Sequence, residues 1–284
     1  MRFAVVGHVE WVDFLEVDHV PVPGEIVTVA DAWAEAAGGG AVAVVQVAKL
    51  AGGAVFFTAL GDDDLGRRSE VQLHGQGVEL ERVLREAPQR RAVTFLDAQG
   101  ERTITTIGPR LVPTSADDLP WDRLADTDGA YFTGGDVGAL RAARAARVLV
   151  ATPRARAALK HSGVELDVLV RSGGDAGEQD RPEQFGYSAR LVVTTEGSRG
   201  GTYSGREGHT GSFKAAPLDG PVVDAYGAGD SFAAGLTYGL GAGMDIEAAL
   251  EIASRCGAGN LMARGPYAGQ PTAEDLDLPP SHAY

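Results

Sequence analysis

Residues 222–232 combine a turn that would attract an anion with two carboxylates. Val222 and Val223 run into Asp224, a small-residue turn follows at Gly227-Ala228-Gly229, and Asp230 begins a helical pattern. Backbone N–H groups at such a helix start are free and unscreened, and the helix dipole is positive there. The stretch therefore predicts an anion site with Asp230 placed to accept a proton. The alternative is a glycine-rich helix start with an Asp near the N-cap and no catalytic role.

Two more small-residue turns would allow a ligand to approach the backbone closely. Gly38-Gly39-Gly40 precedes an apolar helix expected from Ala41 to Leu50, and Glu196–Gly201 follows a strand expected at Leu191–Thr195. Ligands of a parallel α/β sheet bind beyond the carboxyl ends of its strands, where these turns are expected. A flexible loop is the alternative for the triple glycine.

Several familiar site types find no support in the sequence. No G-x-x-x-x-G-K-[ST] motif occurs, and Gly7-His8-Val9-Glu10 is not the glycine fingerprint of a Rossmann dinucleotide site. Three consecutive acids, Asp62 to Asp64, favour a solvated turn with N-cap chemistry over a cation site. Cys256 is the only cysteine, which excludes an intrachain disulfide and predicts a small core residue.

The order of the expected elements indicates the fold class. Strand patterns alternate with helical patterns, which predicts a mostly parallel α/β sheet. Two hairpins are expected outside this alternation, one at about 10–35 and one at 92–108. The first would include a strand at Ile26–Val29, and the two hairpins could pair as a lid. With no internal repeat and no linker, we expect residues 1–284 to form a single domain.

Composition limits the classes of partner. The chain has 284 residues, 44% of them apolar, and a formal net charge of −14. Nucleic acid and anionic membranes demand clustered Lys and Arg, so we expect neither as a partner. The N-terminal segment has no apolar signal-peptide region, and no apolar run approaches the roughly 20 residues of a membrane helix. We therefore expect a cytoplasmic protein.

The turn at residues 224–230 resembles the D-T-x-G-A-G-D signature of the ribokinase-like carbohydrate kinases, the PfkB family. Weaker motifs of that family follow in the same order, namely the opening strand and acid at Gly7–Asp13, the lid hairpin at Pro23-Gly24-Glu25, the glycines Gly38–Gly40, the turn Gly61-Asp62-Asp63 and the nucleotide loop Thr195–Gly200. The resemblance covers nearly the whole chain. It implies a three-layer αβα fold with a mostly parallel central sheet and a small β-sheet lid.

The resemblance implies Mg²⁺-dependent phosphoryl transfer from ATP to a primary hydroxyl of a small sugar or a nucleoside. Asp230 would be the catalytic base, and the N–H groups of Gly227, Ala228 and Gly229 would form an anion hole for the transferring phosphoryl. Aligned N–H dipoles suit a loose transition state whose charge is spread over the phosphoryl oxygens. Because Asp230 lies near a helix N-terminus, we expect its pKa to be depressed.

The remaining roles also come from the resemblance. The expected residues are Asp13 and Gly38, Gly39 and Gly40 for the sugar, Thr195, Gly197 and Gly200 for the nucleotide, Gly257 and Ala258 beside the adenine, Asp175 for Mg²⁺ through water, and Asp224 near a site for K⁺. Lids of this family often pair between subunits. A homodimer through the lid is therefore an alternative to a monomer whose lid folds back.

Four departures separate this chain from the usual pattern. Ala225 replaces a Thr, Val42 and Ala43 occupy the neighbourhood of an Asn, and Ser172–Asp175 stands where the family has N-x-x-E. The lysine that some ribokinases carry within the glycine motif is also absent. A sugar kinase is the main hypothesis. A nucleoside kinase and a catalytically silent sugar- or nucleotide-binding homologue are the alternatives.

Overall fold

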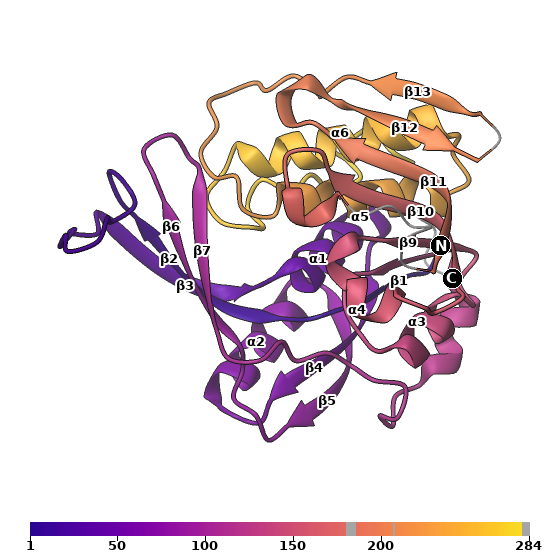
Figure 1. Ribbon diagram of the computed structural model, residues 1–284, viewed down its shortest axis with the longest axis horizontal. Helices are drawn as coiled ribbons and strands as arrows, with labels where there is room; N and C mark the ends of the chain where they lie inside the picture. Colours follow the sequence, from indigo (N-terminus) through magenta and orange to yellow (C-terminus); the bar gives the residue numbers. More distant parts are fainter. Residues whose placement is uncertain (180–185, 207, 280–284) are drawn as a thin grey trace.

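A nine-stranded sheet forms the centre of the protein, in a computed structural model that describes residues 1–179, 186–206 and 208–279 (Figure 1). Neighbouring strands from β11 to β5 run parallel, while β12 and β13 are antiparallel additions at one edge. The strands in spatial order are β13 (Thr210–Phe213), β12 (Gly201–Gly205), β11 (Ser188–Thr195), β10 (Glu165–Ser172), β9 (Val148–Ala151), β8 (Gly129–Phe132), β1 (Phe3–Val6), β4 (Ala54–Gly61) and β5 (Val78–Arg85).

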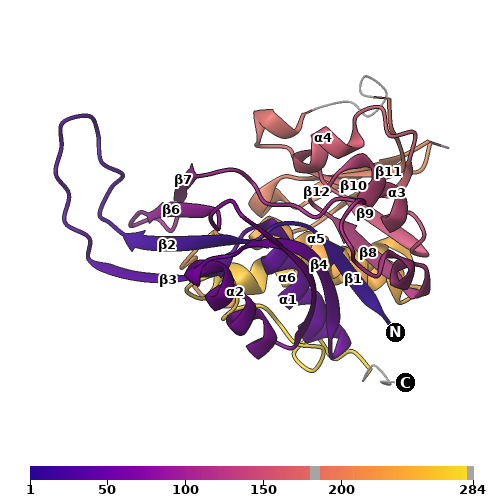
Figure 2. The ribbon, with the colours of Figure 1, turned by 90° about the horizontal axis from the view of Figure 1, so that it is seen from below.

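Helices cover both faces of this sheet, which gives three layers (Figures 1 and 2). Alternate residues of a strand point to opposite faces, so Phe3 and Val5 of β1 join one hydrophobic cluster while Ala4 and Val6 join the other. The first face carries α1 (Gly39–Ala51), α2 (Asp64–Gly75), α5 (Ala228–Gly241) and α6 (Ile246–Leu261), and the second carries α3 (Val137–Ala143) and α4 (Arg156–Leu159).

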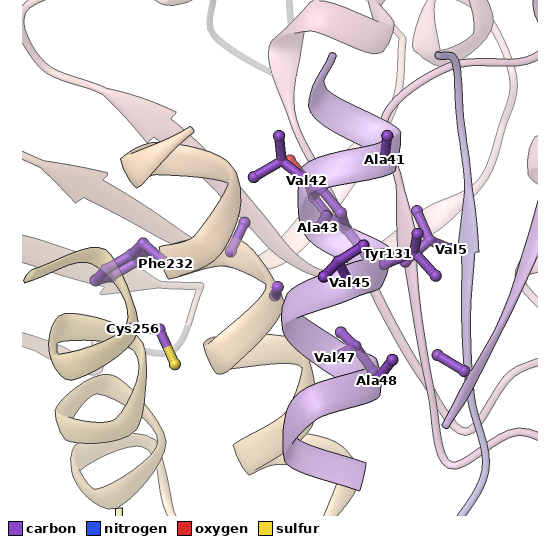
Figure 3. Close-up of a cluster of buried hydrophobic side chains, with 14 of the residues drawn as sticks. Val5, Ala41, Val42, Ala43, Val45, Val47, Ala48, Tyr131, Phe232 and Cys256 are labelled. Atoms are coloured by element: carbon purple, nitrogen blue, oxygen red, sulfur yellow. The ribbon is translucent and has the colours of Figure 1, made fainter. Parts of the chain in front are cut away.

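Small side chains let three helices of the first face pack closely (Figure 3). The buried residues of α1 are mostly Ala and Val, and α1 lies between β1 and α5. A Cβ added at Gly235 of α5 would lie 2.8 Å from the Sγ of Cys256 on α6. Cys256 is fully buried, so the expectation of a small core residue is confirmed. This packing fixes the N-terminal ends of α1 and α5 relative to each other.

A separate four-stranded sheet forms the lid, with the order β3 (Asp31–Ala37), β2 (Glu10–Glu16), β6 (Arg91–Leu96) and β7 (Arg102–Ile107). The parallel pairing of β2 with β6 confirms that the two hairpins join. The expected strand at Ile26–Val29 is wrong. Glu16 pairs with Asp31, so the return strand begins later and Ile26, 97% exposed, lies in the connecting loop. A short apolar alternation forms no strand where no partner strand lies beside it.

The lid, which projects to the left in Figure 2, is docked on the body by aromatic contacts among others. Phe14 of β2 stacks on Trp33 of β3 and meets Tyr226 edge-on, with ring centroids 4.9 and 5.0 Å apart. The guanidinium of Arg264 lies 3.7 Å from the ring centroid of Trp33. At the β6–β7 turn, the N–H of Ala225 donates to the carbonyl of Gly100. The lid therefore contacts the same loop that carries the predicted catalytic stretch.

Within the described residues, no helix has the length and apolar character to span a membrane.

Candidate active site

The site lies where the chain order of the central sheet reverses. From β1 the chain moves outward to β4 and β5 and later returns to β8 on the other side of β1. Ligands of open α/β sheets bind beyond the carboxyl ends of strands at such a point. Gly7 follows β1 and Thr133 follows β8, and a Cβ on Gly7 would lie 2.5 Å from Thr133 Cγ2 and 3.1 Å from Gly40 Cα. These ends and the start of α1 therefore meet closely.

The N-terminal ends of α1 and α5 converge on Asp230. Left-handed glycines precede both helices, Gly38 with φ of 87° and Gly227 with φ of 83°. The N–H of Gly38 donates to the Tyr226 hydroxyl at 3.1 Å, and a Cβ on Gly39 would lie 2.8 Å from Asp230 Oδ1. The structure thus brings the triple glycine, residues 38–40, to the carboxylate predicted as the base.

The start of α5 has the form that an anion hole requires. The N–H groups in the first turn of a helix have no intrahelical acceptor, and the positive end of the dipole lies there. Gly229 is exposed, and a Cβ on it would meet nothing within 4 Å, so a ligand can approach its backbone. Ala228 is partly exposed and Gly227 is buried. Nothing in the geometry conflicts with the predicted anion-binding role of Gly227, Ala228 and Gly229.

Burial raises the pKa of Asp230 to about 6, although the nearby Arg154 and Arg102 act in the opposite direction. The expectation of a depressed pKa is therefore wrong. The reason is that loss of water around a carboxylate outweighs both the guanidinium charges and the helix dipole. A carboxylate with this pKa is a stronger base than an ordinary Asp and is still mostly ionised at pH 7.

Glu10, rather than Asp13, is the lid carboxylate beside this centre. The two residues are three apart in the regular strand β2, so their side chains point to opposite faces. A Cβ on Gly38 would lie 3.2 Å from Glu10 Cγ, and the charge of Glu10 contributes to the raised pKa of Asp230. Asp13 instead forms an ion pair with Arg91 at 2.8 Å. Its contact with the sugar stays a prediction.

Glu178 is a site residue that the sequence comparison with N-x-x-E missed. Its Oε2 accepts the N–H of Ser172 at 2.8 Å, its Oε1 pairs with Arg154 Nε at 2.7 Å, and its charge raises the pKa of Asp230. Asp175, the predicted metal residue, pairs with the same Arg154 at 2.6 Å and accepts the N–H of Gly177. Glu178 lies three positions after Asp175, where the N-x-x-E spacing would place the glutamate. The spacing could therefore not identify it, and the signal that singles it out is its burial in the fold.

The predicted nucleotide loop follows β11 and lies beside this acidic segment. Thr195 ends β11, and its carbonyl accepts the N–H of Gly173 at 2.8 Å. Gly197 and Gly200 have φ of 59° and 81°, which only glycine adopts readily in this tight turn. On α6, Gly257 approaches the α5 start, since a Cβ on it would lie 3.3 Å from Ala228 O, and Ala258 is buried.

Asp224 is buried between two backbone segments. Its Oδ1 accepts the N–H of Tyr226 at 2.8 Å and its Oδ2 accepts the N–H of Gly265 at 3.0 Å. Burial raises its pKa. These bonds tie the signature loop to the segment after α6. They give Asp224 a structural role, and its predicted place near a cation stays a prediction.

The carboxylates near Asp230 could hold Mg²⁺ through its bound waters rather than as a cluster of direct ligands. Among the residues that the structure describes, no three His, Cys, Asp or Glu side chains form a metal-binding group. Mg²⁺ retains several waters and usually takes one or two carboxylates plus substrate phosphates. Asp175 and Glu178 can serve such an ion through water while Arg154 holds them in place.

A protein-family model and several curated relatives resemble this chain. The sequence model described as pfkB family carbohydrate kinase matches residues 2–173 and 178–273. The chain belongs to the PfkB family of carbohydrate kinases. An ATP-dependent ribose-1-phosphate kinase of Halopiger xanaduensis is 31% identical over 278 residues, 91% of each chain. A 5-dehydro-2-deoxygluconokinase of Bacillus subtilis is 34% identical over 113 residues, which cover 40% of this chain and 34% of that protein.

Solved structures share the fold of this PfkB protein. A ribokinase of Arabidopsis thaliana complexed with ribose and ATP has a TM-score of 0.77 and 19% identity, with 97% of each chain covered. A ribokinase of Thermotoga maritima has a TM-score of 0.76 and 20% identity over 98% of each chain. The ribokinase-like three-layer fold with a lid sheet is thereby confirmed.

Proposed function

We propose that this protein transfers the γ-phosphoryl group of ATP to a primary hydroxyl of a small sugar, with Asp230 as the base. The observation that carries the proposal is the convergence of α1 and α5 on a half-buried carboxylate whose pKa is raised to about 6. The sugar hydroxyl would face Asp230, and the first-turn N–H groups of α5 would bind the transferring phosphoryl. Mg²⁺, when bound with the nucleotide, neutralises charge on the phosphate oxygens.

Asp230 has two tasks in this mechanism. It orients the acceptor hydroxyl, and it takes the proton as the bond to phosphorus forms, which in a loose transition state happens late. The lid contributes by covering the site, because exclusion of water limits ATP hydrolysis. We further propose that Gly38–Gly40 and Glu10 contact sugar hydroxyls and that K⁺ binds near Asp224. The residues proposed to line the nucleotide site are Thr195, Gly197, Gly200, Gly257 and Ala258. We also propose that the protein acts as a homodimer joined through the lid, in the cytoplasm, where ATP is supplied.

The test is ADP release with Mg²⁺ and ATP across a panel of pentoses, hexoses, sugar phosphates and nucleosides, each with and without K⁺. We expect turnover with a sugar acceptor and a fall in kcat of at least about 100-fold in Asp230→Asn, with a smaller change in KM. Binding of acceptors without ADP release would support a catalytically silent homologue. Near-normal turnover of Asp230→Asn would exclude Asp230 as the base.

A further inference from the structure

Arg110 is a partly buried guanidinium with no carboxylate partner. Among the described residues, no Asp or Glu oxygen lies within 4.0 Å of it, and it donates a hydrogen bond to the carbonyl oxygen of Arg154 at 3.3 Å. Its neighbours differ in this respect, because Arg90 pairs with Glu10 at 2.7 Å and Arg154 pairs with Asp175 and Glu178. A partly desolvated cation without a counter-charge is costly, so Arg110 is suited to bind an anion.

Two other arginines, Arg90 and Arg154, act on Arg110 through their charge. Burial, followed by the charges of Arg90 and Arg154, lowers the pKa of Arg110 below its ordinary value. Burial and the same arginines, Arg110 first among them, also lower the pKa of His8, which is therefore a neutral ring at pH 7. The buried Nδ1 of His8 has no hydrogen-bond partner among the described residues and lies beside Gly134, where a Cβ would be 3.7 Å away.

A cavity of about 220 Å³ adjoins this cluster. It is lined by Arg110, Pro153, Arg154, Arg156, Asp175, Gly177 and Glu178. Asp230 raises the pKa of Arg110 through its charge, although the two do not form an ion pair. The charge of Asp230 is the smallest of the effects on the pKa of Arg110 and no ion pair joins the two, so they are not in direct contact. A small sugar can bridge that separation, with one end at the base and the other at the guanidinium.

We propose that Arg110, supported by Arg90 and Arg154, binds the phosphate of a sugar monophosphate, so that the acceptor of this kinase is already phosphorylated at the end remote from the reacting hydroxyl. The inference rests on the proposed function. In the reaction the acceptor oxygen forms a bond to the γ-phosphorus, and the bond from that phosphorus to the β,γ-bridging oxygen breaks. ADP leaves with the bonding electron pair, the hydroxyl proton passes to Asp230, and the product is a sugar bisphosphate.

The cavity lining carries three arginines, Arg110, Arg154 and Arg156, against two carboxylates, Asp175 and Glu178, and this excess of one positive charge favours a phosphorylated sugar over an uncharged one. A guanidinium presents its N–H donors as a planar fork that matches phosphate oxygens, and charge-assisted bonds of this kind are the stronger class. Two neighbouring arginines, Arg90 and Arg154, already have carboxylate partners that offset their charge, so Arg110 is the guanidinium that remains available for a direct contact. A guanidinium would also bind the phosphates of ATP. The experiment must therefore distinguish the phosphate of the acceptor from the phosphates of ATP as the group that Arg110 binds.

The experiment compares ribose with ribose 1-phosphate as acceptors in the wild type, Arg110→Met and Arg110→Lys. The matched control is Arg190→Met, which removes an arginine paired with Glu165 at 3.1 Å on an exposed surface. We expect the wild type to favour ribose 1-phosphate. Arg110→Met should raise the KM for ribose 1-phosphate by about 10–100-fold, the loss of one charge-assisted bond, while the KM for ATP stays unchanged. The KM of Arg110→Lys for ribose 1-phosphate should lie between those of the wild type and Arg110→Met, because lysine keeps the positive charge but lacks the planar fork of N–H donors.

Two results would overturn the inference. Equal effects of Arg110→Met on ribose and ribose 1-phosphate would show that no acceptor phosphate binds there, and a raised KM for ATP alone would assign the arginine to the nucleotide. If Arg110→Met does not fold, inorganic phosphate is tested as an inhibitor of the wild type. Competition with the acceptor supports the inference, and competition with ATP alone contradicts it.

Calorimetric binding of ribose 1-phosphate without ATP separates this inference from the proposed function. If no acceptor yields ADP but ribose 1-phosphate binds the wild type and not Arg110→Met, the kinase assignment fails and the phosphate subsite stands. If ribose is phosphorylated at least as efficiently as ribose 1-phosphate, the kinase assignment stands and the subsite fails.

Discussion

At the scale of single residues, the pKa of Asp230 is determined by competing electrostatic effects. Burial raises its pKa, the charges of Arg154 and Arg102 lower it, and the charges of Glu178 and Glu10 raise it, with a result of about 6. Since Arg154 and Glu178 pair with each other at 2.7 Å, removal of either partner changes the field at the base in a defined direction. The pH dependence of turnover can report that field.

We expect log kcat of the wild type to rise with pH and level off above about 6, because the base must be ionised. Arg154→Met should move this midpoint to higher pH, since a stabilising positive charge is lost and the charge of Glu178 is left uncompensated. Glu178→Gln should move it to lower pH. The measurement is the pH profile of kcat at saturating substrates. Shifts of the same sign in both variants would mean that another group controls the profile.

The raised pKa also predicts that Asp230 destabilises the fold. The folded protein binds the Asp230 proton more tightly than the unfolded chain does, so this group contributes less stability as pH rises from about 4 to about 6. At pH 7.5 Asp230→Asn removes an ionised buried carboxylate. We expect a gain of about 1–2 kcal/mol, less than the full pKa difference because the side chain keeps some solvent contact. Thermal unfolding at pH 7.5 and at pH 4 measures it, and the gain should vanish at pH 4.

Sequence reasoning reached some of these residues and missed others for physical reasons. The turn at 227–230 could be assigned because its chemistry is local, with glycines, a helix start and an acid in one stretch. Glu178 and Glu10 could not, since each owes its place to strand register or burial. The pKa of Asp230 was predicted in the wrong direction because the helix dipole can be inferred from sequence, whereas desolvation depends on the packed fold.

At the scale of elements, the close approach of α1 to Asp230 depends on the absence of a side chain at Gly39. A Cβ there would lie 2.8 Å from Asp230 Oδ1 and 3.2 Å from Thr133 Oγ1. We expect Gly39→Ala to displace the carboxylate and lower kcat by about 10–100-fold, with little change in Tm because alanine suits a helix. Steady-state kinetics and thermal unfolding check this. Gly75→Ala is the control, since its Cβ on α2 would meet nothing within 4 Å, and a similar loss of kcat there would contradict the argument.

The elements of the central sheet were more predictable than those of the lid. Buried strands and the helix at residues 41–50 carry long apolar patterns that match the structure, where α1 ends at a left-handed Gly52. The lid strand expected at 26–29 lay in a loop, because the pairing of Glu16 with Asp31 leaves residues 17–30 outside the sheet. Register between strands of a small sheet is set by tertiary contacts such as the stacking of Phe14 on Trp33.

At the scale of the whole molecule, the lid must close over the site and must also open to admit substrates. Buried lid residues such as Trp11 and Phe14 join the main hydrophobic cluster, and polar contacts add to this packing. Arg264, after α6, stacks on Trp33 and forms an ion pair with Asp31 at 2.7 Å, so one side chain ties β3 to the segment that also holds Asp224 through Gly265. This arrangement couples the position of the lid to the loop that begins the catalytic turn.

We expect Arg264→Ala to favour the open lid. Loss of the cation–π contact and of a partly exposed ion pair should raise the KM for the sugar acceptor by about 5–30-fold and increase ATP hydrolysis in the absence of acceptor, because water enters the site. Arg206→Ala, which removes a surface ion pair with Glu165, is the control. Acceptor KM and acceptor-free ADP release are measured for both variants. An unchanged acceptor KM together with unchanged hydrolysis in Arg264→Ala would show that the lid closes without this contact.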